Sequence, residues 1–430
     1  IKADGSGTLW SATFDLAGSI DRASAVAVDQ DDNVLVSGYA WNGSSYDFHT
    51  IKYNGVDGSL AWQVTFNSPA AGSDFPTVIT TDSLNNVYVG GYAQGGSGTD
   101  DFMLIKYGPD GANPDGSPVW QQSYNGIAGG QDRISAIAAG PDGIAVCGYS
   151  QNGTDFDYLI IKYGFNGAQT WLKTHDSGFG DDRAQGIALD SAGHVLVTGQ
   201  VSNSNDLDML TIKYQGGDGT VLWTVPYDGG YADQGRYLQI DAADNVYLSG
   251  STFTLSGFTD LYTARYAGAD GVLAWQKVHN SGGDNTDVPV GLGIDEAGEV
   301  YISGYTDKAG ADIDVLVVKY KKDNGTLLWE SSFNGAAGKD DKAVGMGIDP
   351  DGNVLVGGWS DMWTAGASDY DFFGVKYDAG LLNPPTDLQV STISDTAIDL
   401  SWTDNSANED GFRVWRKQGE LGSWTEVATL

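Results

Sequence analysis

The stretch Asp101-Phe-Met-Leu-Ile-Lys-Tyr107, followed by Trp120, contains the two markers that decide the fold. A basic residue before an aromatic residue recurs seven times along the chain, at positions 52–53, 106–107, 162–163, 213–214, 265–266, 319–320 and 376–377. A tryptophan alternates with this pair at Trp10, Trp62, Trp120, Trp171, Trp223, Trp275 and Trp329, with gaps of 51 to 58 residues. A period of this length is typical of propeller blades and repeat arrays. The chain therefore contains seven copies of one supersecondary unit.

Each copy is expected to form four short strands, which in the second copy are residues 76–81, 87–92, 102–107 and 112–124. These segments alternate in polarity and are separated by Gly, Asp and Asn, which indicates strands and turns. The first-to-second and third-to-fourth connections have the composition of hairpin turns. These turns define one end of each sheet, the turn end. The other loops share the opposite end, the loop end.

The first three strands occur seven times, but no fourth strand follows Tyr377. An isolated fourth strand is expected at residues 8–14. We expect it to complete the blade that the last three strands begin, because this would remove an open sheet edge. The predicted fold of residues 1–377 is an all-β, seven-bladed β-propeller with four-stranded blades.

The period stops after Tyr377. Residues 378–385 include Asn383-Pro384-Pro385 and are predicted to be a linker. Residues 386–430, with Trp402 as the core tryptophan, resemble the first strands of a bacterial fibronectin type III domain. They are about half of the roughly 100 residues that such a sandwich needs. We therefore expect the natural protein to continue past Leu430.

The segments 86–92 and 101–107 resemble the bacterial SBBP β-propeller repeat, and 245–250 and 300–305 repeat the pattern. This resemblance covers residues 1–377 and implies an exported or surface protein of bacteria, often with fibronectin modules appended. The Asp-Gly-x-x-x-Trp endings at 218–223 and 270–275 also look like the tryptophan motif of quinoprotein-type propellers. A quinone pocket would need further residues that the sequence does not offer.

The composition restricts the partners. The 430 residues contain 57 Asp and Glu against 22 Lys and Arg, which gives a net charge of −35. This charge repels phosphate backbones and anionic membranes, so no nucleic-acid partner is expected, and it attracts divalent cations or a basic protein. No apolar run approaches the roughly 18 residues that span a bilayer, so no membrane insertion is expected.

Two charged positions recur in every copy and are interpreted as a structural ring of ion pairs and turn caps. The ring aspartates precede the first strands: Asp21, Asp74, Asp132, Asp182, Asp233, Asp287 and Asp341. The ring cations end the third strands: Lys52, Lys106, Lys162, Lys213, Arg265, Lys319 and Lys376. A further aspartate five residues before each cation projects from the opposite face of its strand. Each cation is therefore expected to pair with an aspartate from a loop or a neighbouring blade.

Calcium is the only cofactor that the sequence suggests. Alternating oxygen ligands occur in two hairpin turns, at Asp29, Asp31 and Asn33 and at Asp349, Asp351 and Asn353. These turns lack the downstream bidentate glutamate of calcium loops, and Asp and Asn are common in hairpins anyway. Aspartates at the loop end, such as 181–182 and 340–341, extend the expectation of calcium to that end. The four histidines do not cluster, and no catalytic residue is assigned.

The ligand-binding surface is expected at the loop end. Aromatic residues that break the sevenfold pattern are candidates for it: Trp41, Phe179, Tyr231, Phe258 and Trp363. Cations that follow ring aspartates could orient an anion there: Arg22, Arg133, Arg183 and Lys342. Exposed aromatics beside Asn and Asp suit sugar rings or protein contacts. Small cores within the loops are the alternative interpretation of each aromatic residue.

These observations favour a secreted or cell-surface bacterial binding module, such as an adhesion, matrix or filament-associated subunit. Its expected partner is an extracellular protein or a polysaccharide. One alternative is a carbohydrate-active lyase or hydrolase on the same face, which should show paired acids in one mouth of the channel. Another is a purely structural subunit of an extracellular assembly.

Overall fold

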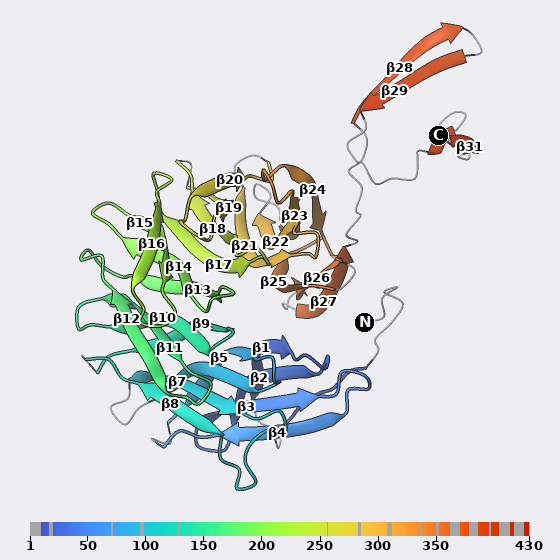
Figure 1. The fold of residues 1–430 in the computed structure, drawn as a ribbon. Helices are drawn as coiled ribbons and strands as arrows, with labels where there is room; N and C mark the ends of the chain where they lie inside the picture. Colours follow the sequence, from blue (N-terminus) through green and yellow to red (C-terminus); the bar gives the residue numbers. More distant parts are fainter. Residues whose placement is uncertain are drawn as a thin grey trace. The chain divides into compact units, whose positions relative to one another are not determined.

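The prediction of an all-β, seven-bladed β-propeller with four-stranded blades is confirmed by a computed structural model (Figure 1). The structure describes residues 10–16, 20–69, 72–94, 99–127, 129–255, 257–282, 285–307, 312–335, 338–349, 352–361, 370–377, 386–394, 397–403, 413–416 and 425–429. In these residues, seven antiparallel sheets follow one another along the chain, six with four strands and the seventh with three.

Each sheet is a meander of consecutive strands. The first strands are β1 (Asp21–Val28), β5 (Asp74–Thr81), β9 (Asp132–Ala139), β13 (Arg183–Leu189), β17 (Asp233–Ile240), β21 (Thr286–Ile294) and β25 (Asp341–Ile348). The second strands are β2 (Val34–Trp41), β6 (Val87–Gln94), β10 (Ile144–Gln151), β14 (Val195–Ser202), β18 (Val246–Phe253), β22 (Val300–Asp307) and β26 (Val354–Asp361). The third strands are β3 (Tyr46–Tyr53), β7 (Asp100–Tyr107), β11 (Phe156–Tyr163), β15 (Leu207–Tyr214), β19 (Thr259–Tyr266), β23 (Ile313–Tyr320) and β27 (Tyr370–Tyr377). The fourth strands are β4 (Leu60–Phe66), β8 (Trp120–Tyr124), β12 (Gln169–His175), β16 (Val221–Tyr227), β20 (Leu273–His279) and β24 (Leu327–Phe333).

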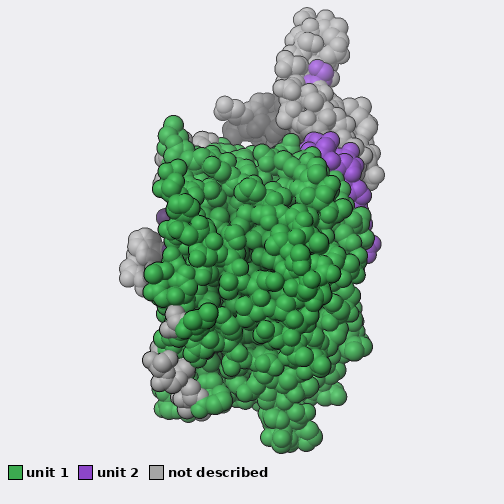
Figure 2. Space-filling view, turned by 60° about the vertical axis from the view of Figure 1, so that its left-hand side comes forward, with its two compact units in different colours: residues 1–292, 306–311 green, residues 293–305, 312–430 purple. Residues whose placement is uncertain are grey.

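The chain divides into two compact units (Figure 2). The first unit contains residues 1–292 and 306–311, and the second contains residues 293–305 and 312–430. Within the first unit, the first strands β1, β5, β9, β13 and β17 contact one another in chain order. Within the second, β23 contacts β25. Among the described residues there is no helix long and apolar enough to cross a bilayer.

The hydrophobic core lies between consecutive sheets. One cluster joins Cys147 and Ile160 of the third sheet to Val197 and Ile212 of the fourth, all of them buried. The second and third strands carry most of these residues because both of their faces are covered, whereas the fourth strands alternate between buried and exposed positions. Burial of apolar surface between neighbouring sheets is therefore what holds consecutive blades together.

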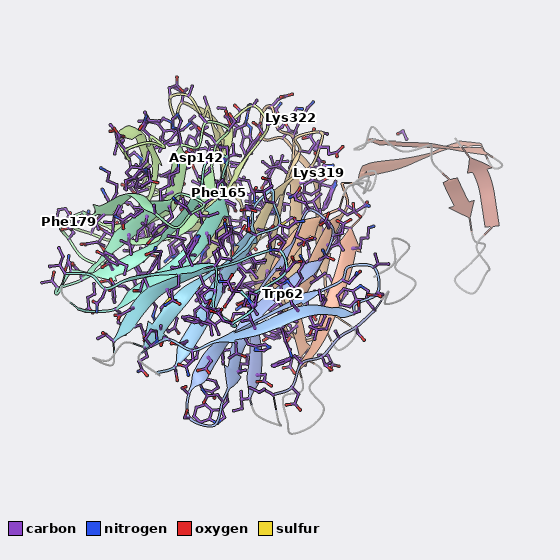
Figure 3. The ribbon with its side chains drawn as sticks, turned by 60° about the horizontal axis from the view of Figure 1, so that its bottom comes forward. Trp62, Asp142, Phe165, Phe179, Lys319 and Lys322 are labelled. Atoms are coloured by element: carbon purple, nitrogen blue, oxygen red, sulfur yellow. The ribbon has the colours of Figure 1, made fainter. Side chains whose placement is uncertain are left out.

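The repeated tryptophans join each sheet to the next at the turn end. Trp62, labelled in Figure 3, donates its indole N–H to the carbonyl oxygen of Pro109 at 2.9 Å, and Trp223 donates to that of Gly268 at 3.1 Å. The same ring covers a turn glycine: a Cβ on Gly271, where φ is +73°, would lie 2.9 Å from the Trp223 ring. The Asp-Gly turns therefore need glycine both for the backbone conformation and for the approach of the indole.

The ring cations occupy the same end. Lys52 and Lys213 form ion pairs of 2.7 Å with Asp29 and Asp190, which lie in the turn between the first and second strands of the same sheet. Lys213 also donates to the carbonyl oxygen of Gly268 in the next sheet at 2.6 Å. Lys162, Lys319 and Lys376 have equivalent aspartate partners, and Arg265 lies over the Tyr247 ring. Lys106 donates to the carbonyl oxygen of Phe165 in the next sheet.

The N-terminal segment differs from its prediction. Residues 10–16 form no strand, and the seventh sheet has three strands in the described residues. A strand is defined by hydrogen bonds to a partner strand, and none is found for this segment. Its side chains nevertheless contact the first sheet as a fourth strand would. Trp10 donates to the carbonyl oxygen of Gly55 at 2.8 Å, which is the contact that Trp223 makes with Gly268.

The fourth strand of the second sheet also differs from its prediction, because it begins at Trp120 and not at residue 112. Residues 113–117 form a turn in which the Asn113 N–H donates to the Ser117 carbonyl oxygen at 2.8 Å. Pro114 and Pro118 have no N–H to donate to a strand ladder, which favours this longer connection.

Beyond the propeller, β28 (Thr386–Ser394) pairs with β29 (Ala397–Thr403), and β30 (Arg413–Arg416) pairs with β31 (Thr425–Thr429). These are two separate two-stranded sheets. The predicted linker, residues 378–385, lies outside the described residues. The fibronectin type III resemblance of residues 386–430 and the domain boundary at 377 therefore stay predictions.

Candidate ligand-binding face

The ring aspartates hold the loops that enter the first strands. Six of them have fully buried side chains: Asp74, Asp132, Asp182, Asp233, Asp287 and Asp341. The carboxylate of Asp74 accepts a hydrogen bond from the Ser68 N–H at 2.7 Å, and that of Asp287 accepts one from the Ser281 N–H at 2.8 Å. The other five accept equivalent bonds from Leu16, Gly126, Ser177, Gly229 and Gly335. Each ring aspartate therefore caps its own loop.

Burial gives these carboxyl groups unusual acidity. It raises the pKa of Asp74 and that of Asp233 to about 6, and it raises the pKa of Asp132 and of Asp182 in the same direction. The cause is removal from water, which disfavours the charged form.

The predicted calcium turns are stabilised by contacts within the protein. The Asp29 carboxylate binds Lys52 and accepts hydrogen bonds from the backbone and side-chain amides of Asn33. Asp31 accepts a hydrogen bond from Asn85 of the next sheet at 2.7 Å. In the second turn, Asn353 donates to Asp349 in the same way, and Asp351 lies outside the described residues. These contacts account for the turn residues without a metal ion, and calcium binding there stays a prediction.

The candidate cations of the loop end lie against aromatic rings of the preceding sheet. The guanidinium of Arg133 lies 4.2 Å from the centroid of the Tyr92 ring and forms an ion pair with Asp100. That of Arg183 lies 4.6 Å from the Phe156 ring and 2.9 Å from Asp181. In the second unit, the Lys342 ammonium lies 4.3 Å from the Tyr305 ring. Such cation–π contacts are stabilising when the cation is partly desolvated.

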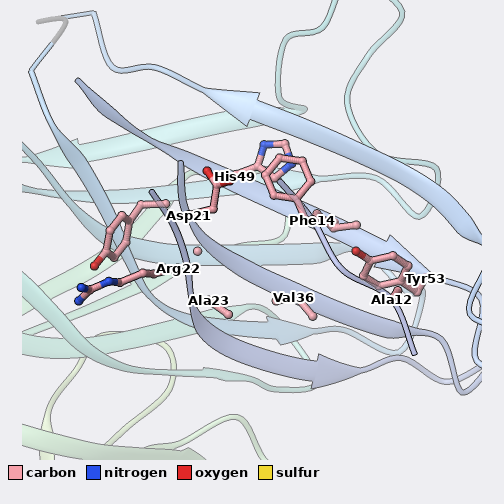
Figure 4. Close-up of a pocket in the computed structure, with 11 residues that line it drawn as sticks. Ala12, Phe14, Asp21, Arg22, Ala23, Val36, His49 and Tyr53 are labelled. Atoms are coloured by element: carbon pink, nitrogen blue, oxygen red, sulfur yellow. The ribbon is translucent and has the colours of Figure 1, made fainter. Parts of the chain in front are cut away.

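Arg22 lies in the only one of these positions that lines a pocket. The pocket has a volume of about 210 Å³ and is lined by residues that include Asp21, Arg22 and His49 (Figure 4). Phe14 stacks on His49 with ring centroids 4.0 Å apart. Burial lowers the pKa of His49, so the imidazole is neutral at pH 7.

A row of aromatic rings extends along the loop end of the first and second sheets. Trp41 packs on Tyr46, and Tyr46 packs on Phe75, with ring centroids 5.0 and 5.8 Å apart. Phe75 also contacts Tyr39 and Tyr92. All five side chains are half-buried. Because Tyr92 in turn contacts Arg133, the row continues to the third sheet.

The remaining aromatic candidates lie in separate loops. Phe179, labelled in Figure 3, is 65% exposed, and Tyr231 is 40% exposed. Phe258 is half-buried in a tight turn in which the Thr254 N–H donates to its carbonyl oxygen at 2.8 Å. Trp363 lies outside the described residues. The structure thus places Trp41 in the aromatic row and leaves Phe179 and Tyr231 as individual exposed rings.

Sequence reasoning missed the tyrosines that form most of the aromatic row. A Gly-aromatic pair recurs near the end of the second strands, at 38–39, 91–92, 148–149, 304–305 and 358–359. The residue after each ring aspartate packs on the aromatic of the preceding sheet in the pairs Phe75 on Tyr39 and Arg133 on Tyr92. This repeated pair is the signal that could have predicted the row.

Comparisons with known proteins identify no family. No family model matches the chain, and no curated protein matches it. Among solved structures, the chain is similar to quinohemoprotein alcohol dehydrogenase from Comamonas testosteroni, with a TM-score of 0.48 and 11% identity over 85% of this chain and 68% of that one. It is similar to BamB from Moraxella catarrhalis, with a TM-score of 0.38 and 14% identity over 80% and 94%. It is also similar to Drosophila semaphorin 1b, extracellular domains 1–2, with a TM-score of 0.40 and 8% identity over 89% and 83%. At these scores the similarities add no argument about activity or partners.

Proposed function

We propose that this chain is a binding or interaction module whose ligand contacts the loop end of the first sheets. The observation that carries the proposal is the continuous row of half-buried rings from Trp41 to Tyr92, with Arg133 at its end. Planar rings at a surface offer large contact area at a low cost in conformational entropy. The contacts among the rings fix their orientation before a ligand binds, which lowers the cost of binding.

The ligand that fits this row best is an extracellular polysaccharide or protein. Aromatic faces suit sugar rings and protein hot spots alike. The net charge of −35 opposes a polyanion, so the ligand is neutral or basic overall. This fits a secreted or cell-surface protein with a role in adhesion, in a matrix or in a filament.

The enzymatic alternative and the purely structural alternative gain no specific support. The buried aspartates with raised pKa each cap a loop, which is a structural task. We therefore argue only the binding role.

The finer architecture forms part of the same proposal. We place residues 1–377 in one propeller, with the N-terminal segment as the missing strand of the last blade. The hydrogen bond from Trp10 to Gly55 supports this, because Trp223 makes the same contact from a fourth strand. Residues 386–430 would then begin a fibronectin type III domain that continues in the natural protein.

The proposal is tested by a glycan array and a polysaccharide pull-down with the whole chain. Wild type should bind a neutral or basic glycan, and Trp41→Ala should weaken that binding at least tenfold. The matched control is Val56→Ala, because Val56 is 88% exposed and lies in a third-to-fourth turn, at the turn end. This control should bind as wild type does.

Phe179→Ala and Tyr231→Ala locate the edge of the surface. If the ligand extends beyond the aromatic row, these variants should weaken binding about threefold to tenfold. Binding that survives Trp41→Ala unchanged would contradict the role of the row. The absence of any glycan ligand would favour a protein partner, to be sought by cross-linking in the native assembly.

A further inference from the structure

Three carboxylates meet at the loop end between the fourth and fifth sheets. Asp208 begins the third strand β15, Asp228 follows the fourth strand β16, and Asp233 begins the next first strand, β17. One oxygen from each of the three lies within 4.8 Å of the others. Oxygens bound to one Ca²⁺ at about 2.4 Å can lie up to about 4.8 Å apart, so these three can share one ion.

Two of these carboxylates have a buried oxygen with no hydrogen-bond partner in the described residues. The Asp233 side chain is fully buried; its Oδ2 accepts the Gly229 N–H at 2.6 Å, and its Oδ1 accepts nothing. The Thr252 hydroxyl lies beside Asp233 but is not aligned to donate to Oδ1. Asp208 accepts the Asn203 side-chain amide at Oδ2, at 2.7 Å, and again Oδ1 accepts nothing. A buried charged oxygen without a partner is costly, and a cation would satisfy both oxygens.

The next sheet boundary shows how the protein neutralises the same position without a cation. There the residue after the fourth strand is Asn280 in place of an aspartate. Its side-chain amide donates to Asp260 Oδ1 at 3.1 Å. This position is occupied by an asparagine at 67, 125, 280 and 334 and by an aspartate at 15, 176 and 228. An aspartate there removes a donor and adds a negative charge.

A second three-aspartate cluster, at the boundary between the third and fourth sheets, provides an internal comparison. It consists of Asp157, Asp176 and Asp182. Here the protein supplies the donors itself. Asp182 accepts three hydrogen bonds, from the Ser177 N–H and hydroxyl and from the Ser202 N–H, and Asp157 accepts the Asn152 amide. The two clusters therefore match in charge and differ in the number of unsatisfied oxygens.

We propose that Asp208, Asp228 and Asp233 bind a divalent cation, Ca²⁺ in preference to Mg²⁺. Three carboxylates with flexible surroundings supply the six to eight oxygens that Ca²⁺ takes, together with water, whereas Mg²⁺ demands a near-octahedral site. Asp228 is exposed and gives the ion access from solvent, while Asp233 anchors it in the protein. The ion would join the fourth and fifth sheets at the end opposite to the repeated tryptophans.

The test is isothermal titration calorimetry of the whole chain with CaCl₂, and with MgCl₂ in parallel. Wild type should show a Ca²⁺ site with a Kd of about 10⁻⁴ M or lower, in the range of extracellular calcium modules. Asp228→Asn recreates the arrangement of Asn280 and should weaken this site at least tenfold. The matched control is Asp176→Asn, which changes the overall charge by the same amount and should leave the site intact.

Thermal unfolding separates loss of the site from loss of the fold. CaCl₂ should raise the melting temperature of wild type and of Asp176→Asn but not that of Asp228→Asn, because a ligand stabilises the state that binds it. In the absence of CaCl₂, Asp228→Asn should be as stable as wild type. A wild type that binds only weakly and without saturation, or an Asp228→Asn variant with unchanged affinity, would overturn the proposal.

Discussion

The two ends of each sheet use buried aspartates and aromatic rings differently. At the turn end, the same contact recurs along the chain: an indole donates to the carbonyl of the next turn, and Lys52 or Lys213 pairs with an aspartate of its own sheet. At the loop end, the positions recur but the residues change. The place that Phe75 occupies in the second sheet is taken by Arg133 in the third.

This difference indicates where the repeat is constrained by folding and where it is not. Every turn must carry a carbonyl for the preceding tryptophan, so its residues are fixed by the neighbour. A loop-end ring needs only a flat or cationic partner, so phenylalanine, arginine and lysine all serve. The loop end can therefore vary from sheet to sheet without loss of the fold, which is what a ligand-binding face requires.

The largest expected effect comes from removal of a turn-end tryptophan. Trp223→Ala should lower the free energy of unfolding by about 4 kcal/mol, because it opens a cavity in the core and leaves the Gly268 carbonyl without its donor. Trp10→Ala should cost about 2 kcal/mol, since Trp10 makes the same hydrogen bond but is only half-buried. Urea unfolding followed by circular dichroism measures both. No effect of Trp10→Ala would show that the N-terminal segment does not act as a fourth strand.

Removal of a ring cation should have a somewhat smaller effect. Lys213→Met leaves the buried Asp190 carboxylate without its ion pair and should cost about 3 kcal/mol. The matched control is Lys339→Met, whose partner Asp312 lies 3.8 Å away at the surface, so it should change stability by less than about 0.5 kcal/mol. Any ligand binding should survive in the folded fraction of Lys213→Met. Normal stability with lost binding would contradict the structural role of the ring.

The sequence predicted the seven sheets because their markers are local and repeated. The Lys-Tyr pair ends each third strand, and the tryptophan lies in a fourth strand wherever one is formed. The strand at residues 8–14 was wrong for a physical reason, because a strand needs a hydrogen-bonded partner that composition cannot supply.

The candidate site was less predictable because it depends on contacts between sheets. Arg133 was proposed as an anion-binding residue, and nothing in its own loop indicates that Asp100 and Tyr92 of the preceding sheet contact its side chain. Likewise, Asp228 looks like any turn aspartate until Asp208 and Asp233 are placed beside it. Contacts of this kind join residues up to about 30 positions apart, which spacing within one repeat does not show.

The smallest expected effect is a pH dependence at the loop end. Burial raises the pKa of Asp74 to about 6, and the charge of Asp47 on β3 raises it further, against the lowering effect of the Ser68 hydrogen bonds. Since the folded pKa lies above the ordinary value of 3.8, the folded state retains a proton that the unfolded chain has lost between about pH 4 and pH 6. The contribution of Asp74 to stability therefore falls as pH rises through this interval and is constant above it. Asp74→Asn cannot ionise, so its stability relative to wild type should rise by about 2 kcal/mol between pH 4 and pH 7.

Urea midpoints of wild type and Asp74→Asn at pH 4, 5, 6 and 7 measure this difference. The turn-end control is Asp57→Asn. Asp57 is exposed, and the Ser59 hydroxyl and N–H lower its pKa, so the difference from wild type should have the opposite sign and be smaller. A constant difference between wild type and Asp74→Asn would show that Asp74 is charged throughout this range. Its loop cap would then be a full ion–dipole contact like that of the turn-end aspartates, and the two ends of the sheet would differ in their residues but not in the state of their carboxylates.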